Sequence, residues 1–298
     1  MKVASLLTPS INKHFTPQLA KAMKNHGFNL EVKTCRQGYK RTVRMSDAIV
    51  TWGVKMPQKW YDKFGIPILY LENGLICQPS GLYMDHKGWF YFSSIVDLPK
   101  LENPDTGPLE AHVRKHLGFE LFQHGNPDGP IMFAHQNPRD ASCRYHYPNH
   151  NKGLGIMESA IKELSERWPD QDVLIRPHPK FKPKWKAIEP EMRKLYWRPK
   201  WKIDTSPNVY ETLKGCSRLV TISSTLVTEA AAMGLPVTPL GRGVWKGVDF
   251  DDRESVTDYL VKVFSRQISY HASHSEIAAH PSFRKFIHAC KAATPKAR

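Results

Sequence analysis

Short apolar runs that alternate with helical stretches constrain the fold of this chain more than any other feature. In the first half, the runs at 2–7, 29–33, 48–51 and 68–71 have the length and content of buried strands. Between the first two, residues 17–25 carry apolar side chains at helical spacing. Strands interleaved with helices predict a mostly parallel α/β sheet with helices on both faces.

The same alternation starts again after residues 98–130, where Pro and Gly recur and indicate a domain junction. Four further strand-like runs follow, at 131–134, 173–175, 219–222 and 236–239. Two α/β halves around such a junction predict two Rossmann-like domains with parallel sheets that face each other across a cleft. We expect an N-terminal domain, a C-terminal domain and a final helical segment at 1–128, 129–265 and 266–298.

The sequence contains no sign of a membrane span or a secretory signal. No segment has the roughly 18 consecutive apolar residues that a spanning helix needs, and the N-terminal apolar run ends early, at Pro9. The five cysteines form no C-x-x-C pair, which is typical of a reduced protein. These features predict a cytoplasmic protein (in the host cytoplasm if a phage encodes it) and leave its oligomeric state open.

The charge is the unusual part of the composition. Lys and Arg number 43 against 28 Asp and Glu, a formal net charge of +15. Such an excess favours a polyanionic partner, which would be nucleic acid, an acidic membrane surface or an acidic polysaccharide. A surface charge that serves solubility alone is the alternative.

Residues 173–179, Val-Leu-Ile-Arg-Pro-His-Pro, are the first of three segments that place polar groups at the end of a predicted strand. Ligands of open parallel sheets bind outside the carboxyl ends of the strands. Arg176 has a planar fork of donors suited to phosphate oxygens, and His178 has a ring N–H that fits the same task. An ordinary strand-to-loop corner with a surface Arg is the alternative.

Residues 220–236 are the second segment, in which a strand ends in Ser223, Ser224 and Thr225 and an Ala-rich helix begins. Hydroxyls and backbone N–H groups at a helix start favour an anion, and the helix dipole adds to this. Glu229, one turn into the helix, is suited to holding sugar or ribose hydroxyls. A plain N-cap with a first-turn acid gives the same pattern, but two such segments one strand–helix unit apart are a more specific signal.

Residues 69–76, Leu-Tyr-Leu-Glu-Asn-Gly-Leu-Ile, are the third segment and belong to the first half. Glu72 follows a buried strand there, and a carboxylate in that place can take a proton from an acceptor hydroxyl. Asn73 would lie beside it on the acceptor side. Asn-Gly favours a turn on its own, so a simple turn is the alternative.

An acid-x-Gly, a His-Pro and a Ser-Ser segment, in this order, resemble those of the bacterial GT-B sialyltransferases and capsule Kdo transferases. The stretch Glu-Ala-Ala-Ala-Met-Gly-Leu-Pro that begins at Glu229 also resembles the donor helix of many GT-B enzymes. The resemblance is limited to the residues around the three segments. It implies a GT-B fold in which the first domain binds the acceptor and the second binds a nucleotide sugar.

The resemblance also implies roles for the residues. Glu72 and His178 are the expected catalytic residues. The expected donor-binding residues on the second domain are Arg176, Ser223, Ser224, Thr225 and Glu229. No metal or other cofactor is required, because cationic and helix-terminal groups stabilise the leaving phosphate, and a UDP-sugar is the expected co-substrate. The family commonly has two acids before the Gly; here Asn73 replaces the second, which leaves inversion or retention open.

Two further loops of the second half contain candidate residues. Gln136 and Arg139 follow the strand at 131–134 and are expected to reach the donor, unless the segment is only a proline turn. The spacing Cys143-x-x-His146-x-x-x-His150 is like that of zinc ligands, but a fourth ligand is missing. We therefore expect no metal site.

Basic residues interleaved with aromatic ones occur at 180–186 and 194–202. Charge combined with stacking is how splayed nucleic acid is often held, and a solvated basic face whose Trp residues pack inward is the alternative. In the first half, a basic run is expected to contact nucleic acid together with Asn73. Its members are Arg36, Lys40, Arg41 and Arg44.

The acceptor that these features favour first is a 5-hydroxymethylpyrimidine in double-stranded DNA, as in phage-type DNA glucosylation. Such an enzyme needs phosphate contacts and an extruded base. An acidic capsule or lipopolysaccharide acceptor is the second choice. A non-catalytic nucleic-acid-binding protein on a GT-B scaffold is the third.

Overall fold

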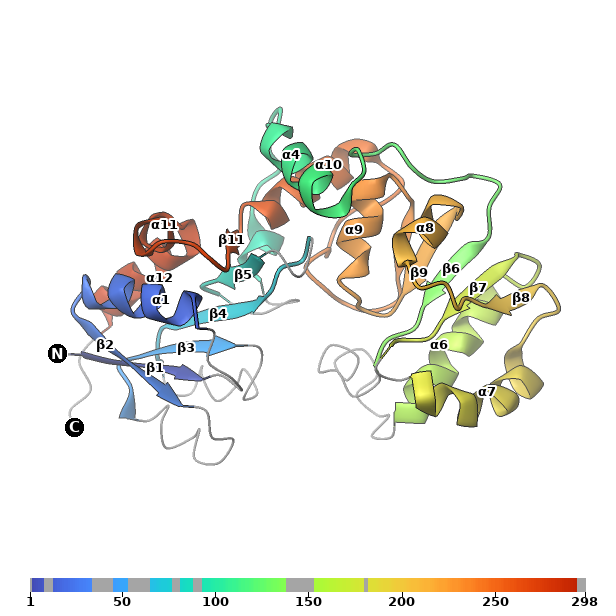
Figure 1. The fold of residues 1–298 in the computed structure, drawn as a ribbon, viewed down its shortest axis with the longest axis horizontal. Helices are drawn as coiled ribbons and strands as arrows, with labels where there is room; N and C mark the ends of the chain where they lie inside the picture. Colours follow the sequence, from blue (N-terminus) through green and yellow to red (C-terminus); the bar gives the residue numbers. More distant parts are fainter. Residues whose placement is uncertain are drawn as a thin grey trace. The chain divides into compact units, whose positions relative to one another are not determined.

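A computed structural model describes residues 2–7, 13–33, 45–52, 65–76, 81–87, 93–137, 153–179 and 182–293. The chain divides into two compact units, drawn in Figure 1. Unit 1 consists of Met1–Pro99 and Lys262–Arg298, and unit 2 consists of Lys100–Val261. The chain therefore leaves unit 1 once and returns to it at the C-terminal end.

Unit 1 contains a six-stranded sheet with the strand order β11-β5-β4-β3-β1-β2. The strands are β1 (Lys2–Leu7), β2 (Phe28–Lys33), β3 (Ala48–Trp52), β4 (Ile68–Asn73), β5 (Gly81–Asp85) and β11 (Gln267–Ser269). The first four pair in parallel, as the alternating pattern predicts. β5 and β11 are antiparallel additions at one edge, and the sequence pattern indicates neither of them.

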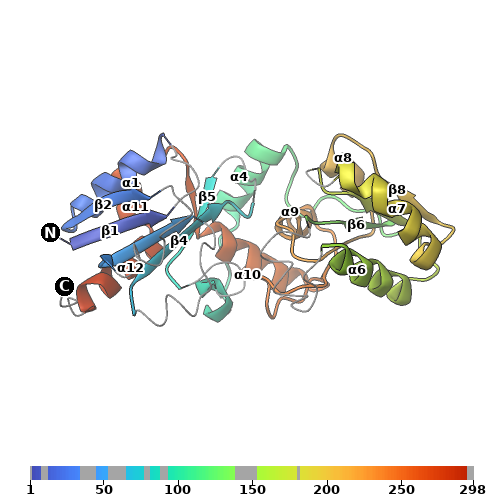
Figure 2. The ribbon, with the colours of Figure 1, turned by 90° about the horizontal axis from the view of Figure 1, so that it is seen from below.

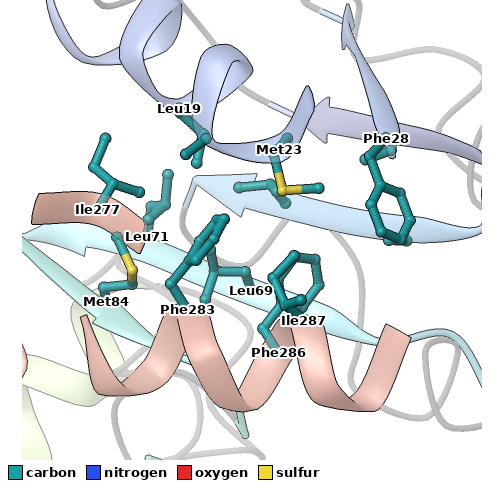
Figure 3. Packing of buried hydrophobic residues seen from close by; sticks show 14 of the residues in the cluster. Leu19, Met23, Phe28, Leu69, Leu71, Met84, Ile277, Phe283, Phe286 and Ile287 are labelled. Carbon is teal, nitrogen blue, oxygen red and sulfur yellow. The ribbon is translucent and has the colours of Figure 1, made fainter. Parts of the chain in front are cut away.

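Three helices pack against the same face of this sheet. They are α1 (Phe15–Lys24), α11 (His274–Ala279) and α12 (Pro281–Ala292). Figure 3 shows Leu19 of α1 and Phe283 of α12 directed into one cluster with Leu69 and Leu71 of the sheet. Alternate residues of a strand share a face, so one set of strand side chains meets all three helices. Each fully buried side chain of this size contributes about 1.5–3 kcal/mol, which holds the C-terminal helices on the N-terminal sheet.

A buried polar network also ties the C-terminal return of the chain to unit 1. Asp85, at the end of β5, accepts hydrogen bonds from Ser93 Oγ at 2.9 Å and from Ser94 N and Oγ at 3.0 and 2.8 Å. Arg266, just before β11, donates from Nε to Ser94 Oγ at 3.3 Å. Asp85 is fully buried and Arg266 is 5% exposed. Buried charges need such partners, so the network favours this one arrangement of β5 and β11.

Unit 2 contains a five-stranded sheet with the order β10-β9-β6-β7-β8, and every pairing in it is parallel. The strands are β6 (Ile131–Ala134), β7 (Val173–Arg176), β8 (Trp201–Ile203), β9 (Arg218–Thr221) and β10 (Val237–Pro239). All four residues of β6 are buried. A central strand with no exposed residue is typical of a parallel sheet that is covered on both faces.

Six helices of the described residues accompany this sheet. They are α4 (Gly107–Leu117), α6 (Gly153–Arg167), α7 (Lys182–Tyr196), α8 (Val209–Lys214), α9 (Leu226–Met233) and α10 (Arg253–Phe264). α6 and α7, seen beside the sheet in Figure 2, share one core cluster with β6 and β7. α9 contacts β9 and β10. Its C-cap, Gly234, has φ +94°, a conformation that glycine adopts readily and other residues do not.

The basic and aromatic stretch at 182–202 forms α7 and β8. Trp185 and Trp201 are each 2% exposed and belong to the core cluster. The guanidinium carbon of Arg193 lies 4.1 Å from the ring centroid of Trp197. In the described part of this stretch, the reading in which Trp residues pack inward is therefore the better one. Residues 180 and 181 lie outside the described residues.

The expected domains at 1–128, 129–265 and 266–298 have other limits than the two units. Residues 100–128 were expected in the first domain, but their backbone bonds to α9: the N–H groups of Phe122 and His124 each donate to a carbonyl near its end at 2.8 Å. The C-terminal helices, expected as a separate segment, pack on the sheet of unit 1. Contacts between residues far apart in the sequence decide both differences: backbone hydrogen bonds to the end of α9 in the first case and apolar packing in the second.

Two smaller features complete the fold. Within the described residues, no helix combines the length and the apolar character that crossing a bilayer would take. Cys216 and Cys290 are buried free thiols, and the other three cysteines lie outside the described residues.

Candidate active site

The predicted donor segments follow neighbouring strands of the sheet in unit 2 and meet at its carboxyl edge. In the register of the parallel pairs, Ala134 at the end of β6 lies opposite Arg176 of β7 and Thr221 of β9. The residues after all three strands therefore leave the sheet at the same edge. This is the edge at which open α/β sheets bind ligands.

Gln136 joins two of these segments directly. Its Oε1 accepts a hydrogen bond from the backbone N–H of Ser223 and another from Ser223 Oγ, the latter at 3.0 Å. Gln136 is 6% exposed and Ser223 is 2% exposed. The predicted role of Gln136, contact with the donor, stays a prediction; in this structure the side chain holds the loop after β6 to the loop after β9.

Ser224 and Thr225 are the more accessible hydroxyl residues of the Ser-Ser-Thr segment, and both are partly exposed. Ser224 Oγ accepts from the N–H of Leu226 at 3.2 Å, at the first residue of α9. Thr225 is the N-cap residue, and its side chain makes no capping hydrogen bond. An anion at this helix start would meet the positive end of the helix dipole. The hydroxyls that can reach it are those of Ser224 and Thr225 rather than that of buried Ser223.

Arg176 has protein acceptors for both of its terminal nitrogens. Nη1 forms an ion pair with Asp204, and Nη2 donates to the carbonyl of Ser206 at 3.0 Å. Asp204 follows β8, so the pair ties the ends of β7 and β8 together. The predicted contact of Arg176 with phosphate stays a prediction, and a phosphate there would share the guanidinium with Asp204. Asp204 could not be singled out from the sequence, because nothing in the local pattern indicates this pairing.

His178 is partly exposed at the end of β7, and a second histidine lies close to it. His135, directly after β6, is 3% exposed, with its ring 5.8 Å from that of Trp185. Burial and the nearby charge of His178 lower the pKa of His135 to about 3. His135 therefore stays neutral at neutral pH. Of these two histidines, the partly exposed His178 is the one that a bound phosphate can reach.

Glu229 lies on α9 and is 5% exposed. Its expected role, the holding of sugar or ribose hydroxyls, stays a prediction. The two neighbouring positions on the helix, Thr228 and Ala230, have no exposed surface, and Thr228 Oγ1 lies 2.8 Å from the hydroxyl of Tyr259. The first turns of α9 are thus packed firmly under the Ser-Ser-Thr segment.

The loop after β10 adds a residue that sequence reasoning missed. Gly241 N–H donates to the carbonyl of Ile222 at 2.7 Å, and a Cβ on Gly241 would lie 2.6 Å from that carbonyl oxygen. Only glycine allows this close approach, and it brings the exposed Arg242 to the same edge of the sheet. The Gly-Arg-Gly sequence after a predicted strand is the signal that could have indicated it.

The predicted acceptor-side residues lie at the end of β4 in unit 1. Glu72 is partly buried and Asn73 is exposed, and Glu72 Oε1 accepts from the N–H of Asn73 at 2.9 Å. Asn73 Oδ1 accepts from the hydroxyl of Tyr270 at 2.8 Å, and the Tyr270 ring stacks on Trp52 with 6.3 Å between centroids. Burial and the charge of Glu72 raise the pKa of Tyr270. Tyr270 is a second residue that the sequence did not reveal.

Several predicted site residues lie outside the described residues. They are Arg36, Lys40, Arg41, Arg44 and Arg139. The zinc-like set Cys143, His146 and His150 lies outside as well. In the part of the chain that the structure describes, no group of three or more metal-binding side chains occurs.

A cavity of about 410 Å³ lies in unit 2 near the amino ends of β6 and β9. Trp168, Gln171 and Arg218 are among the residues that line it. It is at the opposite edge from the Ser-Ser-Thr and His-Pro segments. We place the candidate site at the carboxyl edge, because polar side chains from three strand ends meet there.

Comparison with known proteins supports the fold. Neither protein-family models nor curated protein sequences give a match. Among solved structures, KpsC from Thermosulfurimonas dismutans, a beta Kdo 2,7 transferase, matches with a TM-score of 0.57 and 14% sequence identity. The match covers 97% of this chain and 98% of that chain. The predicted GT-B fold of two Rossmann-like domains is thus confirmed, as is the resemblance to the Kdo transferases.

Two other structures match over similar lengths at lower scores. S. aureus MnaA, in a structure with UDP, has a TM-score of 0.31 at 11% identity and covers 99% of both chains. Acinetobacter baumannii MurG has a TM-score of 0.33 at 10% identity, covering 98% of this chain and all of that chain. Scores at this level support no conclusion about the present chain.

Proposed function

We propose that this chain transfers a sugar residue from a nucleotide-sugar donor to a hydroxyl group of a capsule- or lipopolysaccharide-type glycan. The observation that carries the proposal is the meeting of three strand-end segments at the carboxyl edge of unit 2. The hydrogen bonds from Ser223 to Gln136 join two of them. The fold around this edge is the one that the Kdo transferase KpsC has over nearly its whole length.

In the proposed reaction the donor phosphate binds at the start of α9. Ser224 and Thr225 contribute hydroxyls, and the dipole of α9 favours negative charge at the start of the helix. His178 donates a hydrogen bond from its ring. The acceptor oxygen forms a bond to the anomeric carbon, and the bond from that carbon to the phosphate oxygen breaks. The nucleotide leaves with the electron pair, and these donors stabilise its growing negative charge.

Glu72 is the proposed base that takes the proton from the acceptor hydroxyl. Its Oε1 accepts a hydrogen bond from the Asn73 N–H, which orients the carboxylate at the end of β4. A carboxylate within hydrogen-bond reach of a hydroxyl is the usual arrangement for this task. We propose Asn73 and Tyr270 as residues that orient Glu72 and the acceptor.

A glycan acceptor is better supported than the DNA acceptor that the charge first suggested. No comparison supports DNA, and the described aromatic residues of the basic stretch at 182–202 include Trp185 and Trp201, which are buried. KpsC is a beta Kdo 2,7 transferase. A UDP-sugar remains the first donor to test, and the identity of the sugar is left to experiment.

The test is a transfer assay with a panel of donors and acceptors. Sugar nucleotides of uridine, cytidine, guanosine and thymidine are each incubated with the full chain and an acidic oligosaccharide, or with hydroxymethylated duplex DNA. Mass spectrometry then measures the added sugar, and released nucleotide is quantified. We expect one donor to give a product one sugar heavier on the oligosaccharide, with one nucleotide released per transfer.

Transfer to the hydroxymethylated DNA and not to oligosaccharides would contradict the proposed acceptor while keeping the proposed chemistry. Failure of every donor with both acceptors, in a preparation with an intact fold, would contradict the transferase itself.

A further inference from the structure

The positive charge of the chain is concentrated in unit 1. Its 136 residues, Met1–Pro99 and Lys262–Arg298, contain 20 Lys and Arg against 7 Asp and Glu, a net charge of +13. Unit 2 contains 23 Lys and Arg against 21 Asp and Glu, a net charge of +2. A net charge that serves solubility alone does not need to be concentrated in one unit. The division instead indicates a polyanionic partner of unit 1.

The outer face of α1 and α12 contains much of the charge that the structure describes. We call this face, together with Lys13 two positions before α1, the basic layer. Its six basic side chains are all exposed: Lys13, Lys21, Lys24, Arg284, Lys285 and Lys291. The opposite faces of both helices are apolar and packed on the sheet, as Figure 3 shows, so the charged side chains are directed to solvent.

Acidic side chains are almost absent from this layer. α1 and α12 contain no Asp or Glu. On α11, Glu276 accepts hydrogen bonds from Ser273 N and Oγ at 2.7 Å each, in a capping box. Because its carboxylate is engaged in the capping box, Glu276 neutralises little of the charge of Lys and Arg on the neighbouring helices. The two helices themselves therefore present charge of one sign to solvent.

The chemistry of the layer favours a lipid surface over nucleic acid. Five of its six cations are Lys, which acts as a mobile point charge, whereas Arg is the residue that binds phosphate through two parallel hydrogen bonds. In the described part of the chain, Met45 is the exposed large hydrophobic residue, and no large aromatic residue is classed with it. The exposed positions of α1 and α12 contain no Phe, Tyr or Trp, the large rings on which bases stack best, while diffuse attraction to lipid headgroups needs none.

We propose that the basic layer of unit 1 docks the protein on an anionic phospholipid surface. The inference rests on the proposed function for its purpose, because an acceptor glycan that is carried on a lipid would lie at such a surface. Docking would be peripheral and electrostatic. Each basic side chain near an anionic leaflet raises membrane partitioning by roughly fivefold, so six of them suffice for reversible binding without any apolar insertion.

The layer also reaches the proposed acceptor residues within unit 1. The Tyr270 hydroxyl donates to Asn73 Oδ1 at 2.8 Å, and the next residue, His271, has its ring 4.8 Å from that of His14. His14 follows Lys13 of the layer and precedes α1. Membrane docking through the layer would therefore bring the end of β4 close to the headgroup region, where a lipid-linked acceptor is found.

The test measures binding of the full chain to vesicles of phosphatidylcholine alone or mixed with phosphatidylglycerol. A variant removes five charges of the layer: Lys21→Gln, Lys24→Gln, Arg284→Gln, Lys285→Gln and Lys291→Gln. A matched control removes five exposed charges of unit 2: Lys115→Gln, Lys186→Gln, Lys194→Gln, Lys200→Gln and Lys202→Gln. Circular dichroism checks that both variants are folded.

We expect sedimentation with the anionic vesicles only, and loss of binding as salt rises. The variant of the layer should bind at least about a hundredfold more weakly, and the control should bind like the wild type. Equal loss in both variants, or wild-type binding by the layer variant, would overturn the proposal. So would tight binding of duplex DNA by a chain that does not bind anionic vesicles. Transfer to a soluble acceptor, measured without vesicles, tests the proposed function separately.

Discussion

At the residue scale, the candidate site separates side chains that hold the loops from side chains that can touch a ligand. Ser223 is 2% exposed and bonds to Gln136, and Arg176 bonds to Asp204 and Ser206. His178, Ser224 and Thr225 are partly exposed. We infer that the first group preserves the shape of the carboxyl edge and that the second binds the phosphate.

His178→Ala should lower the turnover number of the transferase by roughly a hundredfold or more, because a donor that stabilises developing charge is lost. The fold should be retained, since His178 is partly exposed. The matched control is His116→Ala, an exposed histidine on α4, which should keep normal turnover. If His178→Ala turns over like the wild type, His178 has no part in the chemistry.

His135 predicts a pH dependence of stability. Its pKa is about 3 in the folded protein, because of burial and the charge of His178, and about 6.5 in the unfolded chain. Between these values the unfolded state binds a proton that the folded state does not bind. Stability is therefore complete above about pH 6.5 and falls as the pH drops towards 3, by about 1.4 kcal/mol per pH unit from this residue.

Urea unfolding of the wild type and of His135→Leu, measured at several pH values, checks this. The variant should have a shallower loss of stability below about pH 6.5. His280 of unit 1, whose pKa burial and Arg266 lower to about 4, contributes to the loss in both proteins. Identical slopes for the two proteins would mean that His135 is not buried in its neutral form.

The motif residues could be predicted because each set of polar residues directly follows a strand in the sequence. The His-Pro and Ser-Ser-Thr segments could be found in this way. The partners Asp204 and Tyr270 could not, because each reaches its residue across a sheet edge: Tyr270 is 197 positions from Asn73, and Asp204 is 28 from Arg176. Nothing in the local sequence sets such distances.

At the element scale, the strands that follow a simple alternation of apolar runs and helices were predicted, and the irregular ones were not. β6 was predicted with the limits that it has, Ile131–Ala134. β5 and β11 were missed because they are short antiparallel additions, and β11 pairs with a strand about 185 positions earlier. α7 was missed because Pro190 lies inside it, and proline normally ends a helix.

The end of α9 gives a prediction that compares two glycines. Gly234 has φ +94°, and a Cβ there would lie 3.0 Å from the Cα of Phe122, whereas Gly247 has φ +81° with open space around it. Both alanine substitutions cost backbone strain of about 1–2 kcal/mol. Gly234→Ala should cost about 1–3 kcal/mol more, because the backbone of Phe122 must move.

Denaturant unfolding of the two glycine variants measures this difference. The hydrogen bond from Phe122 N–H to the carbonyl of Ala232, 2.8 Å long, should also be weakened in Gly234→Ala and exchange its proton faster. Equal stability of the two variants would show that residues 119–125 are not packed against the end of α9.

At the scale of the whole molecule, the two units differ in charge as well as in their sheets. The sequence predicted two Rossmann-like domains and showed a large positive charge. The charge of each unit could be counted only when the structure had placed the C-terminal helices in unit 1. Those helices contribute Arg284, Lys285 and Lys291 to the basic layer. The expectation of a DNA partner came from the total charge. The position of the charge favours a polyanionic partner of unit 1, and we propose an anionic lipid surface rather than DNA.

The central claim is that a nucleotide phosphate binds at the carboxyl edge of the sheet in unit 2. Calorimetric titration of uridine and cytidine mono- and diphosphates tests this without knowledge of the sugar. The proteins are the wild type, a Ser224→Ala/Thr225→Val double variant and a Ser275→Ala control, which changes an exposed hydroxyl of unit 1.

We predict that one of these nucleotides binds the wild type and the control with 1:1 stoichiometry. The double variant should bind it roughly tenfold or more weakly, because hydrogen bonds to a charged group are lost. If no nucleotide binds the wild type, or if the double variant binds as tightly as the control, the donor site is not at this edge and the account is wrong.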